Sequence, residues 1–183
     1  MERPIIGITM GDASGIGPEI AAKAMVSPEV QRVSQSLVIG DKRIMKQALK
    51  VAKLEGVEIN PIKKVGGAKF TPGIIDVLDL ENLEPSRVKV GQICAPSGRA
   101  AVEYLEKAIK LALAKEIDGI ATAPINKEAI HKAGYKYQGH TEILAERTKT
   151  KNYAMMFVSD NLWIMLVTTH VPIKEINRHI DKK

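Results

Sequence analysis

Short apolar runs alternate along this chain with stretches of helical periodicity. Three runs have the length of buried strands, and they cover residues 5–10, 37–40 and 117–122. Between the first two runs, residues 18–26 are predicted to form a helix, because Pro18 lies at a position that suits the first turn. Asp41 is a suitable N-cap for a helix to about Leu54 with Ile44, Ala48 and Val51 on one face.

The clearest helical stretch lies in the middle of the chain. Ser97 is a suitable N-cap for it, and the stretch reaches about Lys115. Its apolar stripe at helical spacing consists of Val102, Leu105, Ile109 and Ala112. A loop over 123–126 then leads to a short helix over 127–133 that Gly134 ends, and another helix follows His140.

Two segments lack the helical periodicity of the stretches described above. Residues 56–96 carry many Gly and Pro, which favours short strands and loops. Near the end, the apolar runs 153–158 and 162–168 are separated by residues 159–161, which predicts two strands joined by a turn, and Pro172 opens a helix. The alternation predicts an α/β fold with a mostly parallel sheet flanked by helices, and no internal domain boundary is assigned within residues 1–183.

In such folds, ligands bind beyond the carboxyl ends of the strands. Three segments follow strands in this way: 11–17, 123–127 and 168–170. The first is rich in glycine, but its order matches neither the dinucleotide fingerprint nor a P-loop. A tight structural turn and a ligand-binding loop are equally good interpretations of it. Lys127 fits a phosphate or carboxylate ligand as well as a solvated helix start.

Two histidines stand beside threonines at breaks in the apolar pattern. His140 and Thr141 precede a helix, where an imidazole, a hydroxyl and free N–H groups can bind a phosphorylated or hydroxylated substrate. The alternative makes Thr141 a helix cap and Glu142 a partner of the helix dipole. His170 follows an apolar strand and precedes Pro172, a position that suits a divalent-metal ligand, although a metal site needs three or four ligands.

Composition narrows the classes of function. The chain has 183 residues, 45% apolar and 26% charged, with a formal charge of +6 that suits an anionic small substrate. Its lysines are spread along helical stretches and aromatic residues are few, so nucleic-acid binding is not favoured. The single Cys94, the lack of a signal-peptide pattern and the lack of a membrane-length apolar run predict a cytoplasmic protein.

Four segments in this order resemble the 4-hydroxythreonine-4-phosphate dehydrogenase family, including its 4-phospho-D-threonate 3-dehydrogenase branch. They are Thr9-Met10-Gly11-Asp12 with Gly15-Ile16-Gly17-Pro18-Glu19, Thr122-Ala123-Pro124-Ile125-Asn126-Lys127, Gly139-His140-Thr141-Glu142, and Thr168-Thr169-His170-Val171-Pro172. Each motif alone is weak, but four in one order across nearly the whole chain are specific.

The resemblance implies an isocitrate/isopropylmalate dehydrogenase-like fold and a homodimer. It implies oxidation of a small phosphorylated hydroxy acid by NAD or NADP, followed by decarboxylation, with a divalent metal (Zn, Mg or Co) as Lewis acid. By the same resemblance, His140 and Thr141 contact the substrate and His170 is a metal ligand, while the catalytic and cofactor-binding residues stay unassigned. The substrate expected first is 4-phosphooxy-L-threonine, in pyridoxal phosphate biosynthesis.

The chain departs from the family in length, because the resemblance places further metal and substrate ligands in a C-terminal half that is missing here. His131 and His179 do not match those ligands and fit surface positions. We therefore expect weak or absent catalysis from this chain alone. Two alternatives remain open: a 4-phospho-D-threonate or D-erythronate 3-dehydrogenase of sugar-acid catabolism, and a non-catalytic binding or assembly domain.

Overall fold

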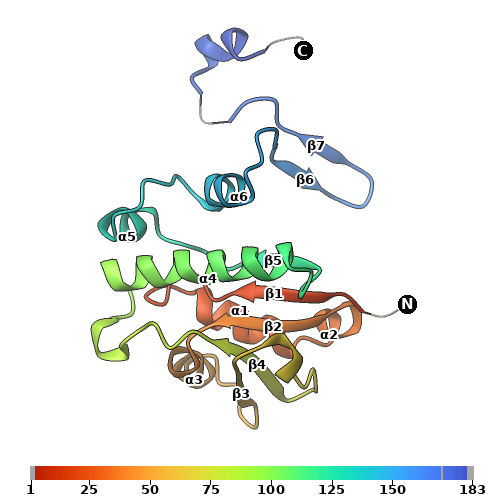
Figure 1. The fold of residues 1–183 in the computed structure, drawn as a ribbon, viewed down its shortest axis with the longest axis vertical. Coiled ribbons are helices and arrows are strands. Elements are labelled where there is room, and N and C mark those ends of the chain that lie inside the picture. The colour runs from red at the N-terminus through yellow and green to blue at the C-terminus, as the bar shows by residue number, and fades with distance from the viewer. Residues whose placement is uncertain (1–2, 170, 181–183) are drawn as a thin grey trace. The chain divides into compact units, whose positions relative to one another are not determined.

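A computed structural model describes residues 3–169 and 171–180. The chain divides into two compact units, Met1–Thr148 (unit 1) and Lys149–Lys183 (unit 2), which are described separately. Unit 1 contains a five-stranded parallel sheet of order β3-β4-β2-β1-β5 (Figure 1). The strands are β1 (Ile5–Thr9), β2 (Gln35–Gly40), β3 (Glu58–Ile62), β4 (Ile74–Asp79) and β5 (Gly119–Thr122). The predicted mostly parallel α/β fold is confirmed.

Four helices lie between these strands along the chain, and two follow the last strand. The first four are α1 (Gly17–Val26), α2 (Pro28–Val33), α3 (Lys42–Val51) and α4 (Ala95–Leu113), with short 3-10 turns at Val65–Gly67 and Pro85–Arg87; α5 (Lys127–Lys132) and α6 (His140–Thr148) come after β5. The step from β1 to β2 and the step from β4 to β5 move across the sheet in opposite directions. Right-handed crossovers then place α1 and α4 on opposite faces of the sheet.

The main core of unit 1 forms where these helices cover the sheet. Its largest fully buried side chains include Met10, Leu37, Ile39, Ile75 and, from α4, Tyr104. Since β2 and β4 are covered on both faces, their central residues are buried without alternation, as is typical of parallel sheets.

Helix α4 is buried on two sides. Of the predicted stripe, Val102, Leu105 and Ile109 are buried, but they pack against Ile130 of α5 and Ile143 of α6 rather than on the sheet. Its fourth member, Ala112, is half-buried and packs against the sheet core instead. A different set of α4 side chains faces the sheet core: Ala100, Tyr104, Ala108 and Leu111. The helix therefore links the sheet to the two helices that follow it.

The predicted cap of α3 is confirmed, whereas the predicted cap of α4 and one predicted residue on the buried face of α3 are wrong. Asp41 caps α3 as expected, accepting a hydrogen bond from the Arg43 N–H. Ser97 is not the cap of α4, because the helix begins at Ala95 and the Ser97 side chain bonds elsewhere. Val51 lies on the exposed side of α3, and the buried face consists of Ile44, Met45, Ala48 and Leu49.

Unit 2 contains an antiparallel hairpin and a short helix. Strands β6 (Met156–Val158) and β7 (Trp163–Met165) pair as predicted, and the Ser159 N–H donates to the Leu162 carbonyl across the turn. After Pro172 the structure forms a 3-10 helix, Ile173–Arg178, instead of an α-helix. No described side chain between residues 149 and 180 is buried.

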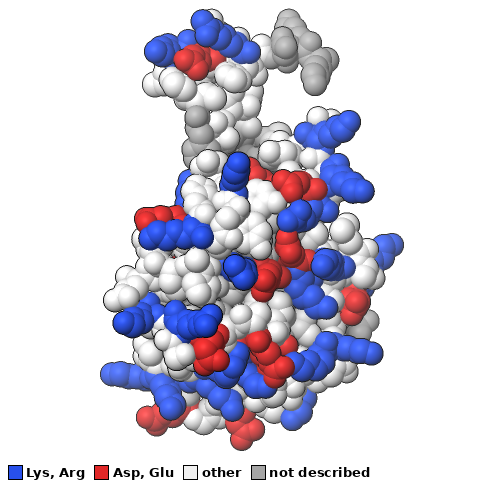
Figure 2. All heavy atoms as spheres, turned by 60° about the vertical axis from the view of Figure 1, so that its left-hand side comes forward, with Lys and Arg blue, Asp and Glu red and all other residues white. Residues whose placement is uncertain are grey.

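Two global properties concern the whole described chain. On the face drawn in Figure 2, Lys and Arg side chains alternate with Asp and Glu side chains over unit 1 and do not gather into a patch of one sign. None of the helices among residues 3–169 and 171–180 combines the length and the apolar character that crossing a membrane requires.

Candidate functional site

The carboxyl ends of β1 and β5 form the point where the order of the sheet reverses. From β1 the chain moves to β2 on one side, and from β4 it crosses to β5 on the other side of β1. Ligands of open α/β sheets bind in the crevice at such a point. The loop after β1 and the loop after β5, two of the segments selected from the sequence, lie there.

These two loops are hydrogen-bonded to each other. The Asp12 N–H donates to the Pro124 carbonyl at 2.9 Å, and the Ala123 N–H donates to the Thr9 carbonyl at 3.1 Å. Gly11 has φ +72°, and a Cβ there would overlap the Pro124 carbonyl oxygen. Glycine is therefore required at this position for both its backbone conformation and the close approach of the loops.

The β1–α1 loop is stabilised internally by Asp12, which is 6% exposed. Its Oδ1 accepts from the Ser14 N–H at 2.8 Å and from the Ser97 hydroxyl of α4, and its carbonyl accepts from the Gly15 N–H at 3.0 Å. The N–H groups of Ser14 and Gly15 thus bond within the loop and are not offered to a dinucleotide pyrophosphate. This favours the structural interpretation of the glycine-rich turn.

His140 lies beside the β5–α5 loop. It is the first residue of α6 and is half-buried, and its Nε2 is buried without a hydrogen-bond partner among the described residues. Burial lowers the pKa of His140 below its ordinary 6.5, while the Ala123 backbone and the charge of Glu142 oppose that shift. The imidazole is therefore neutral near pH 7 and has one nitrogen able to bond to a ligand.

Thr141 and the residues after β5 complete this edge of the sheet. Thr141 is half-buried in the first turn of α6, next to Glu142. Asn126 caps α5, because its Oδ1 accepts from the Ala129 N–H at 3.0 Å, and Lys127 is exposed. The structure thus brings His140 to the β5–α5 loop and places Thr141 next to it in the first turn of α6, while the Asn126 oxygen already accepts a structural hydrogen bond.

The ends of β2 and β4 are closed by an ion-pair network. Asp41 is fully buried, and Arg43 Nε and Nη2 donate to its two oxygens at 3.0 and 2.7 Å. Desolvation raises the pKa of Asp41, but hydrogen bonds from Arg43 outweigh it and hold that pKa below 3.8. An acidic residue after β2 binds the ribose in dinucleotide-binding folds, but here Asp41 is already paired.

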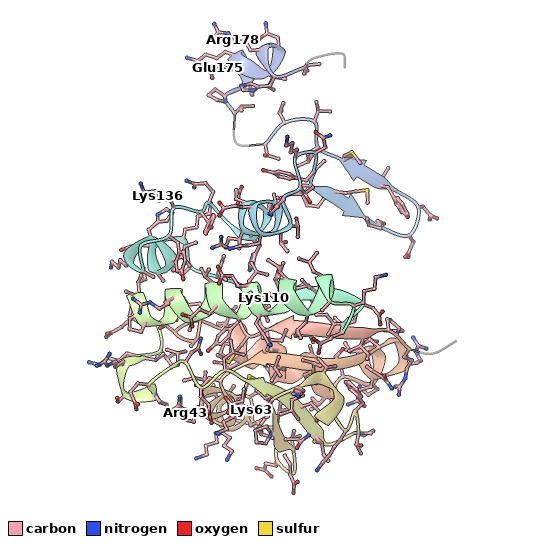
Figure 3. All side chains as sticks on the ribbon, in the orientation of Figure 1. Arg43, Lys63, Lys110, Lys136, Glu175 and Arg178 are labelled. Carbon is pink, nitrogen blue, oxygen red and sulfur yellow. The ribbon has the colours of Figure 1, made fainter. Side chains whose placement is uncertain are left out.

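Four further charged side chains complete the network. Lys42 Nζ lies 3.0 Å from Asp79 Oδ2 and 2.7 Å from Glu81 Oε1, and Lys63 Nζ lies 3.0 Å from Glu81 Oε2. Figure 3 labels Arg43 and Lys63, which come from the start of α3 and from the residue after β3. This edge of the sheet is therefore stabilised by charge pairs and is a poorer ligand site than the ends of β1 and β5.

The predicted metal site is not assembled by the residues that can be described. His170 lies outside them, and no group of three or more His, Cys, Asp or Glu side chains suited to a metal ion occurs within residues 3–169 and 171–180. His131 and His179 are exposed, as expected, and His131 Nε2 is 2.9 Å from the Tyr137 carbonyl oxygen. The described donor set thus does not fit a metal by itself.

Sequence reasoning missed one participant in this site, the side chain of Ser97. An aspartate two residues before a serine indicates that the Asp12 side chain bonds within its own turn. No local signal connects Asp12 with a residue 85 positions later, because that pairing depends on how α4 packs against the sheet.

Comparison with known proteins places these loops in a family context. The family described as pyridoxal phosphate biosynthetic protein PdxA matches residues 32–183. A Clostridium botulinum protein named as a D-threonate 4-phosphate dehydrogenase is 40% identical over 94% of this chain and 52% of its own length. A 4-hydroxythreonine-4-phosphate dehydrogenase from Desulforapulum autotrophicum is 38% identical over 98% of this chain and 53% of its own length.

Solved structures of dehydrogenases that share the name of one of these relatives have the same fold as this chain. A 4-hydroxythreonine-4-phosphate dehydrogenase from Burkholderia phymatum superposes with a TM-score of 0.90 and 39% identity, covering 97% of this chain and 53% of the other. One from Klebsiella pneumoniae gives a TM-score of 0.89 and 34% identity, covering 96% of this chain and 53% of the other. The chain spans about half the length of the curated relatives it matches.

Proposed function

Because the chain belongs to the family of the pyridoxal phosphate biosynthetic protein PdxA, we propose that it forms the substrate-binding part of a dehydrogenase acting on a small phosphorylated hydroxy acid. The substrate proposed first is 4-hydroxythreonine 4-phosphate, and the second is D-threonate 4-phosphate. The observation that carries the proposal is His140, whose buried Nε2, beside the β5–α5 loop, has no hydrogen-bond partner among the residues that the structure describes.

The residues at this site suit the oxygens of such a substrate. A neutral His140 imidazole can donate a hydrogen bond to, or accept one from, a hydroxyl group. The Thr141 hydroxyl and the first N–H groups of α6 suit a phosphate or carboxylate oxygen. The formal charge of +6 favours approach of an anionic molecule. We assign substrate binding to His140 and Thr141 on this chemistry.

The proposed reaction removes a hydride from the carbon of a secondary alcohol and a proton from its oxygen. NAD or NADP accepts the hydride, and the resulting β-keto acid then loses carbon dioxide. In this reaction His140 orients the hydroxyl group through Nε2, and Thr141 fixes the anionic end of the substrate. Such positioning accelerates a reaction by holding the reacting atoms in one geometry.

A divalent metal, Zn, Mg or Co, belongs to the same proposal, with His170 as one of its ligands. A metal would polarise the hydroxyl and the developing carbonyl oxygen. Since the described residues supply no set of three ligands, no step is assigned to the metal here. Homodimer formation is proposed on the same resemblance to the family, and a cytoplasmic location on the single Cys94.

Binding by this chain tests the substrate assignment. We expect both phosphorylated acids to bind in a calorimetric titration, and His140→Gln to weaken the better one by about tenfold or more, since a hydrogen bond to a charged ligand contributes about 1.5–3 kcal/mol. His131→Gln is the matched control, because His131 is exposed on α5. Equal affinities of the two variants would remove His140 from the site.

A dehydrogenase assay then separates catalysis from binding. The second candidate function is a binding or assembly role without catalysis, which the lack of a metal-ligand set among the described residues favours. NADH absorbance is followed with NAD, each divalent metal and each substrate, for this chain and for the full-length Desulforapulum autotrophicum relative. Turnover by this chain would exclude the second candidate. Turnover by the relative alone is expected for a substrate-binding part, and the second candidate is then favoured only if this chain binds neither phosphorylated acid.

A further inference from the structure

Asp12 joins three elements of unit 1 at the edge of the candidate site. Its carboxylate accepts from the Ser14 N–H in its own loop and from the Ser97 hydroxyl in the first turn of α4. The Ser14 N–H is also 3.2 Å from Ser97 Oγ, so the three groups form a closed cluster. Because Asp12 is 6% exposed, these bonds are largely shielded from water and are stronger than they would be at the surface.

The main chain of the same residue reaches the β5–α5 loop. The Asp12 N–H donates to Pro124, and the preceding residue, Ala123, is buried and contributes through its backbone to the electrostatic environment of His140. A change in the orientation of Asp12 therefore acts on the loop beside the imidazole. The path from Asp12 to His140 passes through two neighbouring residues of that loop.

Helix α4 is a suitable anchor for this arrangement. It spans Ala95–Leu113, and its buried side chains pack on the sheet on one side and on α5 and α6 on the other. Gly98, next to Ser97, allows the Ala129 carbonyl of α5 to approach so closely that a Cβ at Gly98 would overlap it. The first turn of α4 thus contacts the β1–α1 loop through Ser97 and α5 through Gly98.

We propose that Asp12 is a positioning residue: by bonding to Ser97 it holds the β1–α1 loop against the β5–α5 loop, and so fixes the place of the His140 imidazole. Asp12 acts through the loops and does not itself need to contact a ligand. The inference rests on the proposed function only for the assignment of His140 to the substrate. The positioning itself can be measured without any substrate.

The side-chain titration of His140, followed by NMR on this chain, is the test. In the wild type, burial keeps the pKa of His140 below 6.5. Asp12→Ala removes the acceptor of both hydrogen bonds, so the loops separate, water reaches the imidazole, and we expect its pKa to rise toward 6.5. Asp12→Asn keeps an acceptor oxygen and should restore the wild-type titration.

The matched control lies at the other ends of the same two strands. Asp118 Oδ2 accepts from the Ile5 N–H at 2.8 Å, so Asp118→Ala also removes a carboxylate bond between β1 and the residue before β5. We expect Asp118→Ala to leave the His140 titration unchanged.

A folded Asp12→Ala with an unchanged His140 titration would overturn the proposal, and so would an equal shift in Asp118→Ala. If Asp12→Ala does not fold, Ser97→Ala decides: a smaller upward shift supports the proposal and no shift overturns it. The outcome is independent of the proposed function. A His140 shift in a protein that binds neither phosphorylated acid would keep the positioning and reject the substrate assignment.

Discussion

Strand β4 of unit 1 and the β6–β7 hairpin of unit 2 invert the usual relation between polarity and burial. β4 contains Asp76 and Asp79, and both are buried. The apolar runs that form the hairpin contain no charged residue, yet Phe157 and Trp163 are exposed. The difference shows that burial depends on whether helices cover a strand, and that residue type alone does not decide it.

The buried aspartates show how the covered strand tolerates charge. Asp76 accepts hydrogen bonds from the N–H groups of Lys69 and Phe70 and from Asn60 Nδ2, so neither of its oxygens is unpaired. Buried polar groups are stable only when they are bonded in this way. The hairpin has the opposite problem, since the described residues of unit 2 (149–169 and 171–180) do not bury its apolar side chains. Two strands alone are at best marginally stable in water.

Among changes to charged side chains, the largest effect is expected from removing the Asp76 carboxylate. Asp76→Ala leaves the N–H groups of Lys69 and Phe70 and the Asn60 amide without their acceptor, and we expect a loss of about 2–4 kcal/mol in the free energy of unfolding. Urea denaturation followed by circular dichroism measures it. Asp160→Ala, in the exposed turn of the hairpin, is the matched control and should change stability by less than about 0.5 kcal/mol. Equal effects would contradict the contrast between the two strands.

A smaller loss is expected from adding one methyl group in the loop of the candidate site. Gly11→Ala introduces a Cβ at φ +72° against the Pro124 carbonyl oxygen. Strain of this kind costs about 1–3 kcal/mol, and the displaced loop should also weaken ligand binding in the calorimetric titration. Gly66→Ala is the control, because nothing lies within 4 Å of its added Cβ. A neutral Gly11→Ala would show that the loops are not in fixed contact.

A still smaller, pH-dependent effect is expected at Glu81. Hydrogen bonds from Lys42 and then Lys63 lower the pKa of Glu81 from 4.5 to about 2. Since the folded state binds this proton more weakly than the unfolded state, the stabilisation is complete above pH 4.5 and is lost as pH falls to about 2. The stability difference between wild type and Glu81→Gln should therefore vanish on acidification. A difference that persists at pH 2 would contradict it.

The smallest effect is expected in the hairpin. Trp163 is 69% exposed, and it is the single tryptophan of the chain, so its fluorescence reports on unit 2. We expect emission typical of an indole in water, and no change in the unfolding of unit 1 in Trp163→Ser. Leu37→Ala, in the covered core, should instead cost about 2–5 kcal/mol. Emission typical of a buried indole would show that a covering layer is present.

Much of the fold could be predicted because its signals are local. Apolar runs located the strands, Asp41 and Pro18 marked helix starts, and Gly134, with φ +93°, ended α5. The errors came where a local preference competed with packing. Ser97 is a good capping residue, but its hydroxyl bonds to Asp12, and the helix begins two residues before it.

The candidate site could be predicted only in part. His140 and Thr141 were selected from a motif, and the structure places His140 beside the loop that follows β5, with Thr141 next to it in α6. Their contact with a substrate stays a prediction, as does metal binding by His170, which lies outside the described residues. Asp12 as a link between α4 and these loops was not predicted, because its partners are distant in the sequence.

By itself, the sequence determined the order of strands and helices, the glycine at the sharp turn after β1, and membership of the family. Periodicity, capping and turn chemistry depend on neighbours along the chain, so they can be recognised there. Only the tertiary structure decided that Asp76 is buried, that Asp41 is paired with Arg43, and that the loops of Asp12 and Pro124 meet. Those outcomes follow from the order of strands in the sheet and from which surfaces the helices cover.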